Sequence, residues 1–88
     1  MKIVHNETNH SFEMETDGAR SYLKYEIEND GDNKKMLLTH TFVAPEHRGQ
    51  GIAAALVNDG LNYARQNGFE IVPVCSYVVS YLKRNPQN

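Results

Sequence analysis

Residues 43–53 restrict the fold of this chain more than any other stretch, because they join an apolar β-type run to a helical run through a loop with two glycines. Glycine accepts a positive φ and lets a ligand approach the backbone closely. The first turn of the helix that follows has backbone N–H groups without partners, and the helix dipole adds positive potential at the same place. The stretch therefore predicts an anion site made of backbone, with a phosphate or pyrophosphate as its ligand.

Arg48 adds a positive charge at the rim of this loop, and its guanidinium can contact a phosphate through two hydrogen bonds. His47, beside it, is a second candidate for phosphate contact. The stretch lacks the Gly-Lys-Ser/Thr of a nucleoside triphosphate loop and the third glycine of a dinucleotide-binding fold. A glycine-rich turn that only joins a strand to a helix is the structural alternative.

Arg48, Gly51 and Ala53 form the pattern R-x-x-G-x-A. This resembles the Q/R-x-x-G-x-G/A signature of the GNAT acetyltransferase superfamily, whose loop holds the pyrophosphate of acetyl-coenzyme A. The flanking residues 37–43 and 73–77, with a cysteine after the last strand, look like a minimal single-domain branch of that superfamily. The resemblance implies that acetyl-coenzyme A is the cofactor and that these residues bind it: Phe42, Val43, His47, Arg48, Gly49, Gln50, Gly51, Ile52 and Ala53.

The resemblance covers residues 35–86 well and the earlier part of the chain only by its number of strands. The helical pair that the family usually has between its first two strands is missing here, as is the hairpin after the last helix. Because those segments help to shape the acceptor pocket in the family, cofactor binding is carried over more directly than acceptor identity.

The chain has 88 residues, too few for a second catalytic domain, so we expect one minimal GNAT-like domain over residues 1–88. Hydrophobic residues make up 40% and charged residues 23%, which is typical of an ordinary soluble globule. The formal net charge of −2 gives no global basic field, so neither nucleic acid nor an anionic membrane is expected as a partner.

Several kinds of protein are not expected from this sequence. Residues 1–6 become polar too soon for a signal peptide, and no apolar segment has the length of a membrane span. A cytoplasmic protein, monomeric or weakly dimeric, is the expectation. The single cysteine cannot form an internal disulfide, and one cysteine with four scattered histidines has no recognisable metal-ligand spacing.

Hydrophobic periodicity predicts the secondary structure. Alternation of apolar and polar residues indicates strands at residues 2–5, 11–15, 19–27, 35–43 and 69–74. Spacing of i, i+3 and i+4 indicates a helix over residues 50–67, and a second helix is expected over 77–84. A strand, helix, strand order requires a parallel pair with a right-handed crossover. The expected fold class is α+β, a mixed, mainly antiparallel sheet of about five strands with two helices.

Cys75 lies between the last expected strand and the second expected helix, where helix N–H groups favour the thiolate form of a thiol. A thiolate is a nucleophile, so Cys75 could accept the acetyl group if the thioester lies along the parallel strands. Most GNAT enzymes instead transfer the acetyl group directly to an amine. Cysteine is also among the most frequently buried residue types, so a structural role stays open.

Two further side chains are candidates for proton transfer. Tyr81 corresponds to the helix tyrosine that protonates the departing coenzyme A thiolate in many GNAT enzymes, although Leu82 follows it where the family usually has a Gly-Phe step. His40, on the strand that enters the loop, is the candidate general base for the ammonium of the acceptor. The alternatives are packing against the sheet for Tyr81 and a hydrogen-bonded structural role for His40.

Phe42 and Val43 are expected to act through their main chain. The resemblance implies that this strand splays from its neighbour, so that main-chain groups of these residues bind the pantetheine arm as an added strand would. Their side chains are expected to be ordinary core and sheet residues.

The sequence supports three functions. The first is an acetyl-coenzyme A dependent N-acetyltransferase acting on a small amine or on an exposed protein amine. The second is a coenzyme A binding module with little or no turnover. The third is acyl transfer through Cys75, or slow hydrolysis of the thioester. The acceptor is not specified by any motif.

Overall fold

The computed structural model describes residues 2–87, which contain one five-stranded sheet, two α-helices and a short 3-10 helix. In chain order the elements are β1 (Val4–Asn6), β2 (Ser11–Thr16), β3 (Ala19–Asp30), β4 (Asn33–Phe42), η1 (Pro45–His47), α1 (Ile52–Gln66), β5 (Glu70–Pro73) and α2 (Ser76–Arg84). The strand order is β1-β2-β3-β4-β5, with antiparallel pairs except for the parallel β4 and β5. The predicted fold class, α+β with a mixed sheet and two helices, is confirmed.

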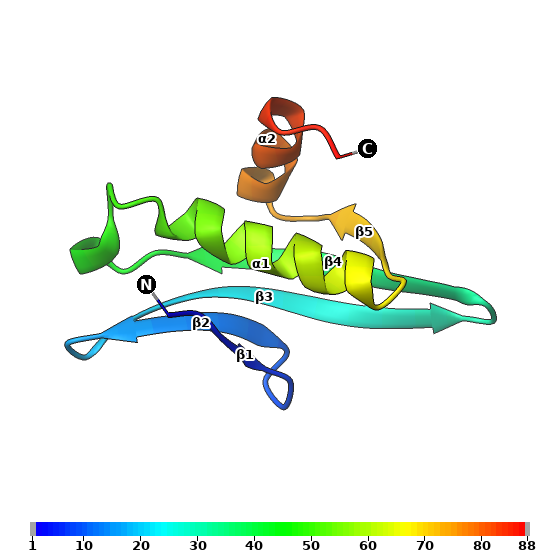
Figure 1. The fold of residues 1–88 in the computed structure, drawn as a ribbon, viewed down its shortest axis with the longest axis horizontal. Helices are drawn as coiled ribbons and strands as arrows, with labels where there is room; N and C mark the ends of the chain where they lie inside the picture. Colours follow the sequence, from blue (N-terminus) through cyan, green and yellow to red (C-terminus); the bar gives the residue numbers. More distant parts are fainter. Residues whose placement is uncertain (1, 88) are drawn as a thin grey trace.

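Helix α1 lies along one face of the sheet, and α2 stands beyond the end of β5 (Figure 1). Alternate residues of β2, β3 and β4 point toward α1, whose own apolar residues recur every three or four positions. The buried side chains that meet there are Phe12, Met14, Leu23, Tyr25, Met36, Leu38, Ile52, Leu56, Val57, Leu61, Ala64 and Val78. Each such large side chain contributes about 1.5–3 kcal/mol by burial, so this layer holds α1 and the start of α2 in place.

Both helices bury their apolar residues on this one side, which we call the helix face of the sheet. The opposite side, the open face, carries the intervening residues of β3, namely Arg20, Tyr22, Lys24 and Glu26. These alternate along the strand with buried residues such as Leu23. The open face is therefore a surface that a ligand can reach.

The hairpin between β3 and β4 is longer than the sequence predicted. The predicted strands end at residue 27 and resume at residue 35, but in the structure Asn29 pairs with Lys34 and Asp30 pairs with Asn33. This part of the prediction is wrong, because Gly31 adopts a φ of 63° and allows a tight turn that lets strand pairing continue to Asp30.

A β-bulge interrupts the pairing of β3 and β4 where the sequence predicts uniform alternation. Tyr25 pairs with Leu38 and Lys24 pairs with His40, so Thr39 is the extra residue. A bulge shifts the alternation of side chains by one position. His40 therefore lies on the open face, whereas Leu38, two residues earlier, is fully buried on the helix face.

Candidate functional site

The loop between β4 and α1 has the backbone geometry of an anion site. Gly51 is the N-cap residue of α1 with φ 75° and ψ 17°, and Gly49 has φ 77°. The first intrahelical hydrogen bond runs from the Ala55 N–H to the Gly51 carbonyl at 3.1 Å. The N–H groups of residues 51–54 therefore lack intrahelical partners, and the first turn contains no acidic residue that would compete with an anion.

A surface cavity of about 270 Å³ lies in front of these groups. Its lining residues are Val43, His47, Arg48, Gly49, Gly51, Ile52, Ala53, Ala54 and Tyr77. The structure thus brings seven of the nine expected cofactor residues around one cavity, whereas Phe42 and Gln50 do not line it. The Gln50 side chain instead donates a hydrogen bond to the Glu46 carbonyl at 3.0 Å, which closes the loop on itself.

His47 has a different environment from the one that its sequence position suggested. Its side chain is only 3% exposed, and both ring nitrogens have partners. Nε2 lies 2.6 Å from the Thr16 hydroxyl and Nδ1 lies 2.7 Å from the Ser21 hydroxyl. Ser21 also accepts a hydrogen bond from the Ala44 N–H at 2.9 Å. These contacts tie η1 to β2 and β3, so His47 braces the loop and its nitrogens are already occupied.

Strands β4 and β5 separate beside the cavity. Their pairing ends where Leu38 meets Pro73, and the Leu38 carbonyl accepts hydrogen bonds from both the Val74 N–H at 3.1 Å and the Cys75 N–H at 3.0 Å. Beyond this point β4 continues to Phe42 and pairs only with β3. Outward-pointing main-chain groups of residues 39–42 on that edge can therefore bond an extended ligand.

Cys75 lies at this separation and caps the N-terminus of α2. Its Sγ is 3.5 Å from the Thr41 hydroxyl, and the side chain is partly buried. Burial by itself raises the pKa of the Cys75 thiol, but hydrogen bonds from Thr41 and from the backbone of Tyr77 and Val78 favour the thiolate, and the net pKa is lowered. The geometry therefore favours the nucleophilic form of this sulfur.

The two tyrosines of α2 lie on one side of the helix, with ring centroids 6.4 Å apart. Tyr77 lines the cavity in front of the loop. Tyr81, the expected proton donor, is partly buried against the core. Sequence reasoning missed Tyr77, although its i, i+4 relation to Tyr81 puts both residues on the same helix face and was available as a signal.

His40 and Phe42 both lie on the open face, on either side of Thr41. His40 is exposed and pairs across the strands with Lys24, so the structure does not bring it against Cys75. The Phe42 side chain is 43% exposed, which corrects the expectation that it belongs to the core. The physical reason is the bulge at Thr39, which turns Phe42 away from α1.

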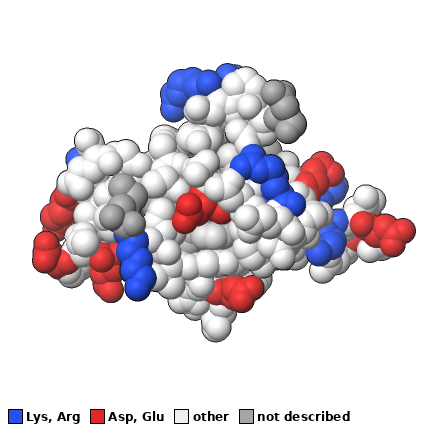
Figure 2. Space-filling view, in the orientation of Figure 1, with Lys and Arg blue, Asp and Glu red and all other residues white. Residues whose placement is uncertain are grey.

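Charged side chains of both signs are interspersed over the face visible in Figure 2. The formal net charge of −2 likewise gives the chain no overall positive field. Within residues 2–87, no group of three or more potential metal-ligating side chains is found. None of the helices in the same range is long and apolar enough to cross a membrane.

A mixed sheet with a glycine loop at the start of α1 and a separation of its two parallel strands fits the fold that the sequence resemblance implies. Residues 11–88 match the family described as GCN5-related N-acetyl-transferase, so the chain belongs to this family. The resemblance to the GNAT superfamily is thereby confirmed.

Two known proteins illustrate the relationship. The chain is 51% identical over 39 residues to N-acetyltransferase 8 of Homo sapiens, a match that covers 44% of this chain and 17% of that protein. Its fold is similar to the crystal structure of an acetyltransferase of Trypanosoma brucei, with a TM-score of 0.59 and 20% sequence identity over 89% of this chain and 60% of that one. The chain spans less than two thirds of the length of either protein.

Proposed function

We propose that this protein is an acetyl-coenzyme A dependent N-acetyltransferase that acetylates an amine of a small molecule or of a protein. The observation that carries the proposal is the cavity at the N-terminus of α1, next to the unpaired edge of β4. A loop with two glycines in the left-handed region, where an added Cβ would meet no atom within 4 Å, suits a ligand that lies against backbone.

The chain's own groups fit the two halves of the cofactor. The N–H groups of residues 51–54 and the Arg48 guanidinium would hold the pyrophosphate. The edge of β4 from Thr39 to Phe42 would bond the pantetheine arm through its main chain. When bound, acetyl-coenzyme A supplies an activated acetyl group as a thioester.

Transfer to an amine requires two proton movements. His40 would accept the proton of the acceptor's ammonium and so produce the nucleophilic amine. A tyrosine of α2 would donate a proton to the departing thiolate. Tyr77 is better situated for this role than Tyr81, because Tyr77 lines the cavity and Tyr81 does not, although both pack against the core. A phenol can donate this proton without bringing a net charge into the site.

Calorimetric titration with acetyl-coenzyme A tests the binding half of the proposal. Arg48→Glu replaces an attractive charge by a repulsive one, so affinity is expected to fall by about 1–3 kcal/mol, the scale of one charge-assisted contact. Arg65→Glu makes the same change of net charge at an exposed position in the last turn of α1 and should leave affinity nearly unchanged. Equal losses in both variants, or equal binding of pantetheine and coenzyme A, would contradict phosphate anchoring by the loop.

A second function is favoured by one observation, the contact of Cys75 with Thr41 and the lowered thiol pKa. In this route the Cys75 thiolate attacks the carbonyl carbon of the thioester, the bond between that carbon and the coenzyme A sulfur breaks, and coenzyme A leaves as a thiolate that is then protonated. An amine or water subsequently removes the acetyl group from Cys75, which returns to its thiolate.

Mass spectrometry after incubation with acetyl-coenzyme A tests this route. The protein is expected to become one acetyl group heavier, with the adduct on Cys75 and removable by hydroxylamine. Cys75→Ser should bind coenzyme A and show no such adduct. An adduct that turns over as fast as an amine is acetylated supports the covalent route. Full acetyltransferase activity in Cys75→Ala would refute it and leave direct attack by the amine.

A further inference from the structure

Two aromatic side chains form a stacked pair on the open face, and we call Tyr22 and Phe42 the aromatic platform. They are direct cross-strand partners on β3 and β4, with ring centroids 5.4 Å apart and an interplanar angle of 28°. Phe42 is 43% exposed, an unusual state for a phenylalanine in a sheet. A pair of rings with an accessible surface can accept a third flat group.

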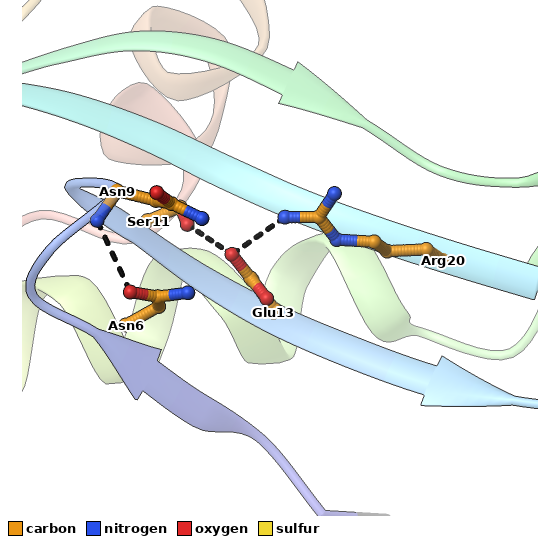
Figure 3. Close-up of polar contacts among 5 residues, drawn as sticks. All are labelled: Asn6, Asn9, Ser11, Glu13 and Arg20. Atoms are coloured by element: carbon orange, nitrogen blue, oxygen red, sulfur yellow. Dashed lines mark hydrogen bonds and ion pairs between the residues drawn. The ribbon is translucent and has the colours of Figure 1, made fainter.

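A polar network on β2 and β3 lies beside the platform, and Figure 3 shows its members Ser11, Glu13 and Arg20. The Arg20 guanidinium donates to the Glu13 carboxylate at 2.6 Å, and Ser11 donates to the same carboxylate oxygen. Arg20 Cζ also lies 5.7 Å from the centroid of the Tyr22 ring. The Glu13 carboxylate therefore neutralises the Arg20 guanidinium, and the guanidinium packs near the Tyr22 ring. The exposed side of Phe42 remains available to a ligand.

The platform adjoins the proposed site along β4. Phe42 lies between Thr41, whose hydroxyl contacts the Cys75 sulfur, and Val43, which lines the loop cavity. His40 lies on the same face as Phe42, two residues before it. On the open face, His40 and Phe42 are side chains of β4 that follow the point where its pairing with β5 ends.

The charges beside the platform restrict the acceptor further. Lys24, opposite His40 and two residues from Tyr22, has no carboxylate within 4.0 Å in the part of the chain that the structure describes. A free positive charge repels a polycation and favours the neutral form of a nearby amine, which is the nucleophilic form. Glu26 follows on the same face beyond Lys24, farther from Phe42.

We infer that the aromatic platform selects the acceptor: a monoamine whose amine is joined by a short linker to an aromatic ring, with the ring stacked on Phe42 and the amine toward His40. The inference rests on the proposed N-acetyltransferase function. Tyr22 and Phe42 would then determine specificity, and His40 would meet the amine at the same face.

Binding is measured first, because it does not depend on turnover. Phenethylamine and propylamine are each titrated into the protein saturated with coenzyme A, and amide chemical shifts are followed by NMR. Phenethylamine is expected to bind about 2–12-fold more tightly, the scale of one aromatic stacking contact, and to shift the amides of Tyr22, His40 and Phe42. Tyr22→Ala and Phe42→Ala should abolish this difference, and Tyr22→Phe should retain it.

Val4→Ala is the matched control, because Val4 is also an exposed apolar side chain of the sheet, 52% exposed, on the distant strand β1. It should leave the ratio of the two affinities unchanged. Acetyl transfer is then compared by the ratio of kcat/KM for phenethylamine and propylamine, which should fall in both platform variants, while spermidine should be the poorest acceptor.

The outcomes separate the inference from the function on which it rests. Selective binding of phenethylamine without transfer to any amine would refute N-acetyl transfer and uphold the platform. Transfer to propylamine and phenethylamine with equal affinity and equal kcat/KM would uphold the function and overturn the platform. A preference for spermidine, or a ratio that survives Phe42→Ala, would also overturn it.

Discussion

His40→Ala is expected to lower kcat for amine acetylation by about 100-fold or more while leaving the affinity for acetyl-coenzyme A nearly unchanged. A general base contributes about 10²–10⁴-fold, and it acts in the transition state, whereas the loop supplies ground-state binding. The exposed position of His40 on the open face allows it to exchange its proton with solvent after each turnover. Steady-state kinetics over a range of pH, with calorimetric titration of the cofactor, measures both quantities.

His10→Asn provides the matched control for this experiment. His10 is an exposed histidine in the turn before β2 with a φ of 52°, a backbone conformation that asparagine tolerates well. Its loss should leave kcat unchanged. If His40→Ala keeps full turnover at every pH, another group or water removes the proton, and His40 has no role as a base. A parallel loss of cofactor affinity would instead indicate damage to β4.

The connection between β1 and β2 is shorter in this chain than the resemblance to the family implies. The resemblance implies a helical pair between the first two strands, but here β1 and β2 are joined by residues 7–10 alone. The aromatic platform includes the exposed Phe42, on the strand that leads to the candidate cofactor cavity. The sheet itself can therefore provide the surface that binds the acceptor. The binding measurements with phenethylamine and propylamine test this.

Sequence periodicity was sufficient for the elements and for the cofactor loop, because both depend on local interactions. The apolar spacing in residues 50–67 predicted α1 to within two residues at its start, and the glycines at 49 and 51 do adopt positive φ. The strand, helix, strand order of β4, α1 and β5 correctly predicted that β4 and β5 are parallel. These features need only the helical repeat, the strand repeat and the freedom of glycine.

The parts that the sequence did not predict depend on partners distant in the chain. The bulge at Thr39 arises from the register of β3 against β4 and decides which face His40 and Phe42 occupy. His47 finds hydroxyl partners on two strands, 31 and 26 residues earlier in the chain. No local sequence pattern encodes the bulge or the hydrogen bonds of His47. His47 and Arg48 therefore looked equally suited to bind phosphate, although only Arg48 is exposed.

His47→Ala is expected to lower the free energy of unfolding by about 2–4 kcal/mol, because it removes the hydrogen bonds between the imidazole and two hydroxyls and opens a cavity under the loop. The hydroxyls are those of Thr16 and Ser21, on β2 and β3. Urea unfolding of the cofactor-free protein measures the change, with Arg48→Glu as a control that should unfold nearly as the parent does.

His47→Gln should recover part of the lost stability, since an amide retains one donor group and one acceptor to replace the two ring nitrogens. The two roles of His47 predict opposite results. If His47 stabilises the loop, His47→Ala should lower the free energy of unfolding whether or not coenzyme A is present. Saturating coenzyme A should then raise that free energy only because it binds the folded state. A phosphate contact would leave cofactor-free unfolding unchanged and lower affinity directly. The burial of His47 at 3% exposure and its two occupied nitrogens lead us to expect the first result.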